Sequence, residues 1–387
     1  MKFKTMSVHS GQRIDPQTGA LTTPLYQSST FSYFNAQAGK ERFAGQAPGF
    51  IYSRFGNPTT AELEQKLAAL EGADEALVVA SGMAAVSAIM YALADSGDEV
   101  AYIGPLYGGT DAFLKQTFSR AGIKVTAYES DQDLLANIRP ATKVVLFETL
   151  TNPTLKVVDP RVVVEAARKV GAISVCDNTF LTPYLLRPLE LGIDIVMHSG
   201  TKYLGGHGDI IAGVVAGSHA LMKSIRTVAL KHIGSPIGPQ EAYLLQRGVK
   251  TLPLRMDAHL HNAQKVADFL AAHPAVKKVI YPGLVSHPGH DALGAFASGF
   301  GGMVSIELEG GFARCATLLD NLQLFVQAVS LGDLESLACH PASTTHAAMD
   351  EASRLAAGVN DDLIRFSIGV EDADDLIADL AAALSLV

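Results

Sequence analysis

The sequence has little cysteine, and this scarcity argues against a disulfide scaffold or a zinc site. Its three cysteines, Cys176, Cys315 and Cys339, lie far apart, and none of them forms a C-x-x-C pair. Disulfide frameworks and structural zinc sites need closely spaced cysteines, so we expect a protein of a reducing compartment, the cytoplasm. The charged segment Met1–Lys4 is followed by no apolar run, and we therefore expect no signal peptide.

Charged residues are also few, and basic ones are the minority. They make up 18% of the chain, with 30 Lys and Arg against 39 Asp and Glu, which gives a net charge of -9. A general binder of nucleic acid or of anionic membranes needs a basic surface, so we exclude both. One basic pocket for a phosphate remains compatible with this balance.

At 387 residues the chain exceeds what one hydrophobic core usually serves, so we expect two packed units.

Three motifs of other enzyme classes are missing. The chain has no G-x-x-x-x-G-K-[ST], no G-x-G-x-x-G after a strand and no H-E-x-x-H. The pair His287 and His290 resembles metal ligands but lacks a third ligand nearby, so we interpret it as a loop and predict no metal. The uncharged stretch Ala76–Ala94 is long enough to span a bilayer, but Ser81, Gly82 and Ser87 interrupt it. We interpret it as a buried strand, a turn and a buried helix.

Short apolar runs alternate with helical patterns through the middle of the chain. Such alternation predicts an α/β fold with a mainly parallel sheet covered on both faces. The expected strands are 76–80, 99–103, 124–128, 143–148, 172–177 and 194–198, and the expected helices are 82–94, 110–121 and 160–170.

The sequence divides into three parts. Residues 1–50 have no sustained periodicity and predict an arm; residues 51–250 form the large unit; residues 251–387 form a smaller α+β unit. A helical pattern runs from about 239 to 272, with a break near Pro253. Beyond it we expect strands at 276–281, 302–308 and 324–329 and helices at 314–319 and 372–384.

Polar groups follow the apolar runs of the large unit, where an open α/β sheet binds ligands. Lys202 lies after a strand beside a glycine-rich turn, and Asp177 ends a neighbouring strand. A buried lysine with a lowered pKa attacks aldehydes, and a carboxylate can pair with a protonated pyridine nitrogen. Each residue alone also fits an ordinary role, a surface lysine or a turn aspartate. Together they indicate a pyridoxal-phosphate site.

A phosphate site is indicated where a strand turns into a helix. The backbone N–H groups at Ser81-Gly82-Met83 and the helix dipole favour an anion, although Ser81 also fits a plain helix cap. The hydroxyl groups of Ser199 and Thr201 can serve the same phosphate. Tyr107, followed by two glycines, can lie against an aromatic ring or simply pack in the core.

The string SGTKYLGGHGD at 199–209 strongly resembles the lysine motif of the Cys/Met-metabolism family of pyridoxal-phosphate enzymes. This family includes cystathionine γ-synthase, cystathionine lyases, methionine γ-lyase and O-acylhomoserine sulfhydrylases. Further matches follow the family's order along nearly the whole chain. They are YSRFGNPT (52–59), SGM (81–83), YGGT (107–110), DNT (177–179), SLG (330–332), HPASTTH (340–346) and RFSIG (365–369).

The resemblance implies an aspartate aminotransferase-like fold of type I, with a mainly parallel seven-stranded sheet and a smaller C-terminal domain. It also implies a homotetramer of two dimers with shared active sites. Its cofactor would be pyridoxal 5'-phosphate, held covalently by Lys202. The other cofactor-binding residues that it implies are Tyr52 and Arg54 from the neighbouring subunit, Gly82, Met83, Ser199 and Thr201 at the phosphate, Tyr107 on the ring and Asp177 at the pyridine nitrogen.

For the substrate, the resemblance implies that Arg365 binds the α-carboxylate with help from Asn152 and Ser330. Lys202 would move protons between the α and β carbons, and Tyr107 would act as the acid for the leaving thiol. The expected reaction is γ-elimination from methionine or homocysteine to 2-oxobutyrate, ammonia and a thiol. A catalytically inactive cofactor-binding scaffold is the alternative from another class, and retention of both Lys202 and Asp177 argues against it.

Within the family, the segments 43–45, 328–333 and 336–342 are most similar to methionine γ-lyase. The neutral Val329 suits a methyl thioether better than the distal ammonium group of cystathionine. Two positions depart from that pattern, since Gly109 stands where a cysteine is usual and His232 where an acidic residue is usual. Cystathionine γ-lyase activity, and cystathionine γ-synthase or O-acylhomoserine sulfhydrylase activity, are therefore the alternatives.

Overall fold

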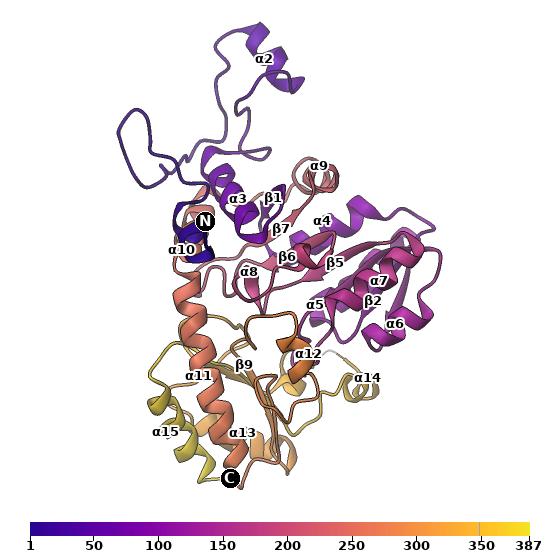
Figure 1. Ribbon diagram of the computed structural model, residues 1–387, viewed down its shortest axis with the longest axis vertical. Helices are drawn as coiled ribbons and strands as arrows, with labels where there is room; N and C mark the ends of the chain where they lie inside the picture. The colour runs from indigo at the N-terminus through magenta and orange to yellow at the C-terminus, as the bar shows by residue number, and fades with distance from the viewer. Residues whose placement is uncertain (348) are drawn as a thin grey trace.

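The computed structural model describes residues 1–347 and 349–387, and its larger half is built on a seven-stranded sheet (Figure 1). In spatial order the strands are β1 (Glu75–Val79), β7 (Gly213–Gly217), β6 (Ile195–Ser199), β5 (Ile173–Asp177), β4 (Thr142–Glu148), β2 (Glu99–Ile103) and β3 (Lys124–Tyr128). The strands from β6 to β3 run parallel, whereas β7 is antiparallel to both its neighbours. The expected mainly parallel sheet is confirmed. The antiparallel β7, a short run bounded by Gly213 and Gly217, is not among the expected strands.

Alternate residues of each strand pack on opposite faces of this sheet. On β2, Val100 and Tyr102 face the hydrophobic cluster under α4 (Gly82–Leu93), whereas Ala101 and Ile103 face the cluster under α7 (Pro160–Val170). The remaining helical segments of this half are α3 (Pro58–Glu71), α5 (Gly108–Ala112), η1 (Phe113–Thr117), η2 (Phe118–Ala121), α6 (Asp131–Asn137), α8 (Thr182–Leu185), η3 (Pro188–Leu191), α9 (His219–Arg226) and η4 (Thr227–Ile233).

The uncharged stretch Ala76–Ala94 forms β1, a turn and α4, as the sequence indicated. Ile89 and Met90 of α4 are fully buried against the sheet. Within the described residues, no helix combines the length and the apolar character needed to cross a membrane. The stretch is therefore apolar because it is buried in the protein core.

The expected single helix at 110–121 is wrong in detail. The segment begins as α5, widens into the π-helical η1 and ends as the 3-10 turn η2. A π-helical turn brings residues five apart onto one face. Phe113 and Phe118 stack there with ring centroids 5.6 Å apart, and Tyr91 packs edge-on against both.

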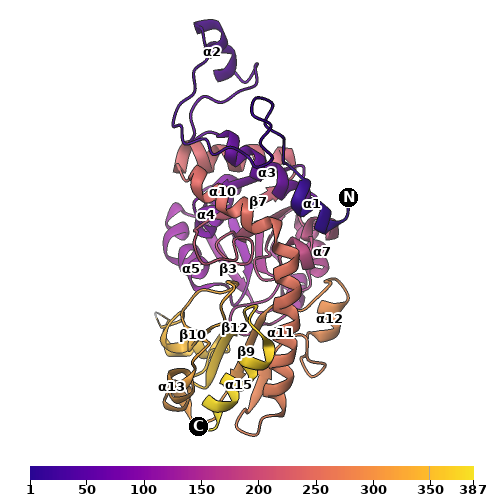
Figure 2. The same cartoon turned by 90° about the vertical axis from the view of Figure 1, so that its left-hand side faces the viewer.

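The first fifty residues contain two short helices, α1 (Phe3–His9) and α2 (Ala36–Phe43), which the expected irregular arm did not include. The helix α1 is docked on the body, because Lys66 Nζ donates to the backbone carbonyls of Ser7 at 2.9 Å and Val8 at 3.1 Å. The helix α2 instead stands away from both sheets (Figure 2).

A second sheet of five strands forms the C-terminal half. In spatial order its strands are β10 (Val326–Gln327), β11 (Leu337–Cys339), β12 (Leu363–Ser367), β9 (Met303–Glu307) and β8 (Lys278–Ile280). The long helical pattern forms α10 (Pro239–Lys250) and α11 (Leu252–Ala272), so the predicted break is confirmed. The other helical segments are α12 (His290–Gly294), α13 (Gly311–Asn321), η5 (Pro341–Ser343), α14 (Glu351–Ala356) and α15 (Ala373–Leu384).

One expectation for this half needs correction. The predicted strand 324–329 is reduced to the two residues of β10, because the backbone N–H groups of Leu324 and Phe325 bind the Asp379 carboxylate instead of a strand. Arg365 lies in the middle of β12, between Ile364 and Phe366 of the core. Its side chain consequently leaves the sheet on the opposite face from that core.

Candidate functional site

Lys202 lies in a tight turn directly after β6. Its backbone N–H donates to Ser199 at 3.2 Å, and its side-chain Nζ donates to Ser330 Oγ at 3.0 Å. Burial and the nearby Arg365 lower the pKa of Lys202, whereas the carboxyl group of Asp333 opposes this change. The amine therefore loses its proton more easily than an ordinary lysine, which is what a nucleophile requires.

Asp177 ends β5, the strand beside β6. Its Oδ1 accepts hydrogen bonds from the backbone N–H of Thr179 at 3.0 Å and from the hydroxyl of Thr179 at 2.5 Å. The hydroxyl of Thr179 in turn accepts from the backbone N–H of Ser199 at 2.8 Å, which ties the ends of the two strands together. Burial raises the pKa of Asp177, while the bonds from Thr179 and the charge of His198 oppose the rise.

The N-terminus of α4 packs against the end of β6. Ser81 caps this helix, since its side chain accepts from the backbone N–H of Ala84 at 3.0 Å. A Cβ atom on Gly82 would lie 3.1 Å from Cβ of Ser199, so glycine permits this close approach. The hydroxyl of Thr201 accepts from the backbone N–H of Ala212 at 3.0 Å. The N–H groups of Gly82 and Met83 begin the helix, where an anion is favoured.

Tyr107 precedes α5 and is 48% exposed. Its ring lies over Gly109, because a Cβ atom built there would be 2.6 Å from a ring carbon of Tyr107. The backbone N–H of Tyr107 donates to Oε1 of the buried Glu148 at 2.6 Å. Glycine at position 109 therefore gives the tyrosine ring its present place.

Arg365 reaches from the small sheet to the loop after β4. Its Nη1 donates to Asn152 Oδ1 at 2.9 Å, and its Nη2 donates to the backbone carbonyls of Val329 and Ser330 at 3.1 Å each. The residue is only 2% exposed, and its Nε has no hydrogen-bond partner among the described residues. Together these contacts bring Asn152, Val329, Ser330 and Arg365 beside Lys202.

Two of the candidate cofactor-binding residues, Tyr52 and Arg54, contact the arm and the end of η4 rather than the side chains around Lys202. Tyr52 forms a bridge with Thr30 of the arm and is 43% exposed. Arg54 donates to the backbone carbonyls of Leu230 at 2.9 Å and Lys231 at 3.3 Å, at the end of η4. The exposed His232 belongs to the same segment.

Sequence reasoning missed two buried acids of this site, Glu148 and Asp333, each 7% exposed. Burial and the charge of Asp177 raise the pKa of Glu148 to about 8. The Oδ1 of Asp333 has no hydrogen-bond partner within the described part of the chain. The available signal for Glu148 was an acidic residue closing the apolar run KVVLF, where a buried strand meets the ligand-binding edge.

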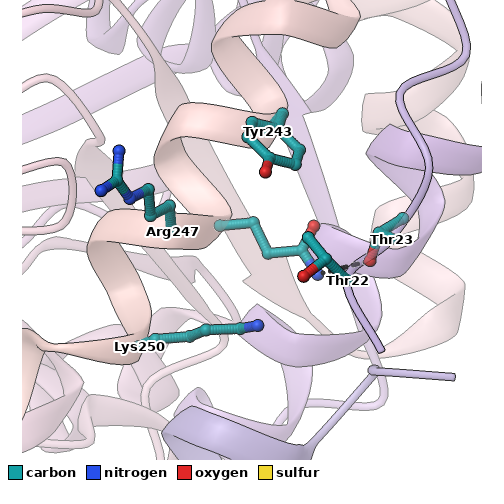
Figure 3. Close-up of a pocket in the computed structure, with 6 residues that line it drawn as sticks. Thr22, Thr23, Tyr243, Arg247 and Lys250 are labelled. Carbon is teal, nitrogen blue, oxygen red and sulfur yellow. Dashed lines mark hydrogen bonds between the residues drawn. The ribbon is translucent and has the colours of Figure 1, made fainter. Parts of the chain in front are cut away.

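Two cavities lie apart from this cluster. One, of about 160 Å³, lies between the arm and α10 (Figure 3). Its lining residues are Thr22, Thr23, Tyr243, Gln246, Arg247 and Lys250. A groove of about 900 Å³ includes His287. In the residues that the structure describes, no group of three His, Cys, Asp or Glu side chains is arranged to hold a metal ion.

Comparison with known proteins identifies relatives along the full length. Residues 4–385 match the family described as Cys/Met metabolism PLP-dependent enzyme. The chain is 46% identical over 385 residues to the L-methionine gamma-lyase of Pseudomonas putida, covering 99% of this chain and 97% of that one. It is 44% identical over 387 residues to the cystathionine gamma-lyase of Bacillus subtilis (strain 168), covering 99% of both.

Solved structures agree with this assignment. A Campylobacter jejuni protein, whose crystal structure carries N'-pyridoxyl-lysine-5'-monophosphate, matches with a TM-score of 0.95 and 35% identity over 100% of both chains. The expected fold of type I, with its mainly parallel sheet of seven strands and smaller second sheet, is thereby confirmed. The chain belongs to the Cys/Met metabolism family of PLP-dependent enzymes.

Proposed function

We propose that this enzyme catalyses γ-elimination from a sulfur-containing amino acid, with methionine and homocysteine as preferred substrates. The observation that carries the proposal is one cluster of side chains. Lys202 Nζ lies 3.0 Å from Ser330 Oγ, and Ser330 is also held by Arg365, the residue that fits a substrate carboxylate. A base and a carboxylate-binding fork thus adjoin the same serine.

The residues at the sheet end fit pyridoxal phosphate. Lys202 would hold it covalently, Asp177 would face its pyridine nitrogen, and Tyr107 would lie against its ring. Gly82, Met83, Ser199 and Thr201 would hold the phosphate at the N-terminus of α4, as the close approach of Gly82 to Ser199 permits. When bound, the cofactor supplies an electron sink that stabilises negative charge on the substrate α-carbon.

The protein's own groups would then carry out binding and proton transfer. Arg365, anchored by Asn152, would bind the substrate carboxylate as a bidentate fork and so orient the α-carbon toward Lys202. Lys202, whose pKa is lowered by burial, would move a proton between the α and β carbons. Tyr107 would donate a proton to the departing thiol. One water molecule would be consumed in hydrolysis, and the products would be 2-oxobutyrate, ammonia and the thiol.

The side chain of Val329 supports a substrate without a distal charge. It is 60% exposed and its backbone carbonyl contacts Arg365, so it borders the substrate position. A second candidate is cystathionine cleavage, favoured by Gly109 and His232 and by the similarity to the Bacillus subtilis cystathionine gamma-lyase. A replacement reaction on an O-acylhomoserine is the third.

We also propose a homotetramer of two dimers in which Tyr52 and Arg54 serve the cofactor phosphate of the neighbouring subunit. In a single chain Arg54 binds the end of η4, and the projecting arm around α2 exposes Phe34 and Phe43 at 89% and 66%. Apolar side chains exposed together favour contact with a second copy.

We propose that each subunit consists of three parts, the arm 1–50, the large domain 51–250 and the small domain 251–387. The free, buried thiols of Cys176, Cys315 and Cys339 support a cytoplasmic location.

One experiment tests the proposed reaction. The ratio kcat/KM for 2-oxobutyrate release should be measured for methionine, homocysteine and cystathionine under one condition. We expect methionine and homocysteine to exceed cystathionine. An advantage of tenfold or more for cystathionine would assign the enzyme to cystathionine cleavage, and turnover only with an O-acylhomoserine and a thiol would make it a synthase. Absence of turnover together with a cofactor absorption band would indicate an inactive scaffold.

A further inference from the structure

Glu148 is a buried acid at the end of β4 to which the proposed reaction gives no part. It lies in register with Asp177 on the neighbouring parallel strand β5. Residues paired in this way point to the same face of the sheet, and the strands lie about 4.8 Å apart. The two carboxyl groups are therefore neighbours at the edge where the cofactor would bind.

Glu148 also holds the segment that carries Tyr107. Its Oε1 accepts the hydrogen bond from the backbone N–H of Tyr107 at 2.6 Å. The ring of Tyr107 is half exposed, so contacts with other side chains do little to fix it. The backbone N–H of Asn152 lowers the pKa of the same carboxyl group, so the loop that anchors Arg365 lies close to Glu148.

Two carboxyl groups this close do not both ionise readily. On Asp177, the two hydrogen bonds from Thr179 and the charge of His198 favour the ionised form. Burial together with the charge of Asp177 raises the pKa of Glu148 to about 8. The contacts from Thr179 thus favour negative charge on Asp177, and the environment of Glu148 favours its protonated form.

We propose that Glu148 is a positioning residue, which fixes the backbone of Tyr107 by accepting its N–H at the sheet edge beside Asp177. The inference rests on the proposed placement of the cofactor between Tyr107 and Asp177. It concerns the orientation of the bound cofactor, and it is independent of which sulfur compound is cleaved.

The test compares Glu148→Ala with Glu148→Gln in the full-length protein. The dissociation constant for pyridoxal phosphate and the visible circular dichroism of the bound cofactor are measured at one pH. Glu148→Ala should weaken cofactor binding by about tenfold to a hundredfold and reduce the dichroism band, because the Tyr107 N–H loses its acceptor. Glu148→Gln keeps an uncharged acceptor oxygen, so its affinity should return to within about threefold of the starting protein.

Two further variants complete the experiment. Glu129→Ala removes an exposed acid just after β3 and should leave cofactor binding unchanged. Glu148→Asp, which is one methylene too short to reach Tyr107, should behave like the alanine variant and replaces it if Glu148→Ala does not fold. Equal losses in Glu148→Gln and Glu148→Asp would show that the acceptor oxygen is not what matters and overturn the proposal. Unchanged affinity and dichroism in Glu148→Ala would overturn it too. The substrate comparison described above can fail without altering either readout.

Discussion

Arg365 of the small sheet and Asn152 of the large one meet through a hydrogen bond of 2.9 Å, although 213 positions separate them in the chain. Both side chains are buried, at 2% and 6% exposed. The bond therefore joins the two halves at the point where we place the substrate carboxylate. It holds the guanidinium in one orientation before any substrate arrives.

Loss of this anchor should weaken substrate binding more than turnover. In Asn152→Ala we expect KM to rise about tenfold, equivalent to about 1.4 kcal/mol, with a smaller change in kcat. Asn152→Asp should raise KM further, because its negative charge competes with the substrate for Arg365. Steady-state kinetics with one substrate decide this. A fall in kcat at constant KM would show that Asn152 acts on the reaction step.

Lys202 should be the residue that sodium borohydride links to the cofactor. Lys202→Ala should lose this reducible linkage and should lose turnover by about three orders of magnitude or more, since it removes the proposed base. Mass spectrometry of the reduced, digested protein provides the measurement. Cofactor still fixed to the variant chain would identify another lysine and refute the assignment.

Shared active sites predict complementation between two inactive variants. Arg54→Ala and Lys202→Ala should each be nearly inactive alone. Hybrids of the two should regain part of the activity, because some of their sites combine an intact Arg54 from one subunit with an intact Lys202 from the other. Differently tagged chains allow the hybrid to be purified and assayed. Failure of a verified hybrid to recover would place both residues in the site of one subunit.

Asp333 should control the pH at which Lys202 becomes a nucleophile. Burial and Arg365 lower the pKa of Lys202 and Asp333 raises it, so Asp333→Asn should lower it further. Uptake of cofactor by the apoprotein needs the neutral amine, and its rate should rise with pH through this pKa. The midpoint in Asp333→Asn should therefore move to lower pH. Glu335→Gln, an exposed acid two residues away, is the matched control. A midpoint that stays in place or moves upward would contradict the role of Asp333.

Val329 should contribute to substrate choice. Val329→Glu places a carboxylate beside the substrate position and should favour the distal ammonium group of cystathionine. We expect the ratio of kcat/KM for cystathionine over methionine to rise by about tenfold to a hundredfold, the range for one partly buried charge partner. Val329→Gln is the uncharged control of similar size. An unchanged ratio in Val329→Glu would show that position 329 does not set specificity.

The patterns along the chain predicted most of the large sheet, because all its strands except the edge strand β3 are largely buried apolar runs, and many are separated by helices with clear caps. Asn57, Ser81, Ser130 and Asp159 each cap a helix there. The short strands of the small sheet and the antiparallel β7 of the large sheet were harder to predict. The three-residue β11 and β7 are defined by their hydrogen-bonded partners rather than by a periodicity of their own.

The sequence by itself determined the strand-end positions of Lys202 and Asp177, since parallel strands bring their carboxyl ends to one edge. Only the tertiary structure decided that Ser330 reaches Lys202, that Asn152 holds Arg365 and that Glu148 supports Tyr107. The physical reason is the origin of these contacts. They join residues that are distant in the chain through side-chain hydrogen bonds. The bonds of Ser330 and Arg365 form when the two sheets pack together, and the bond of Glu148 forms when β4 pairs with β2.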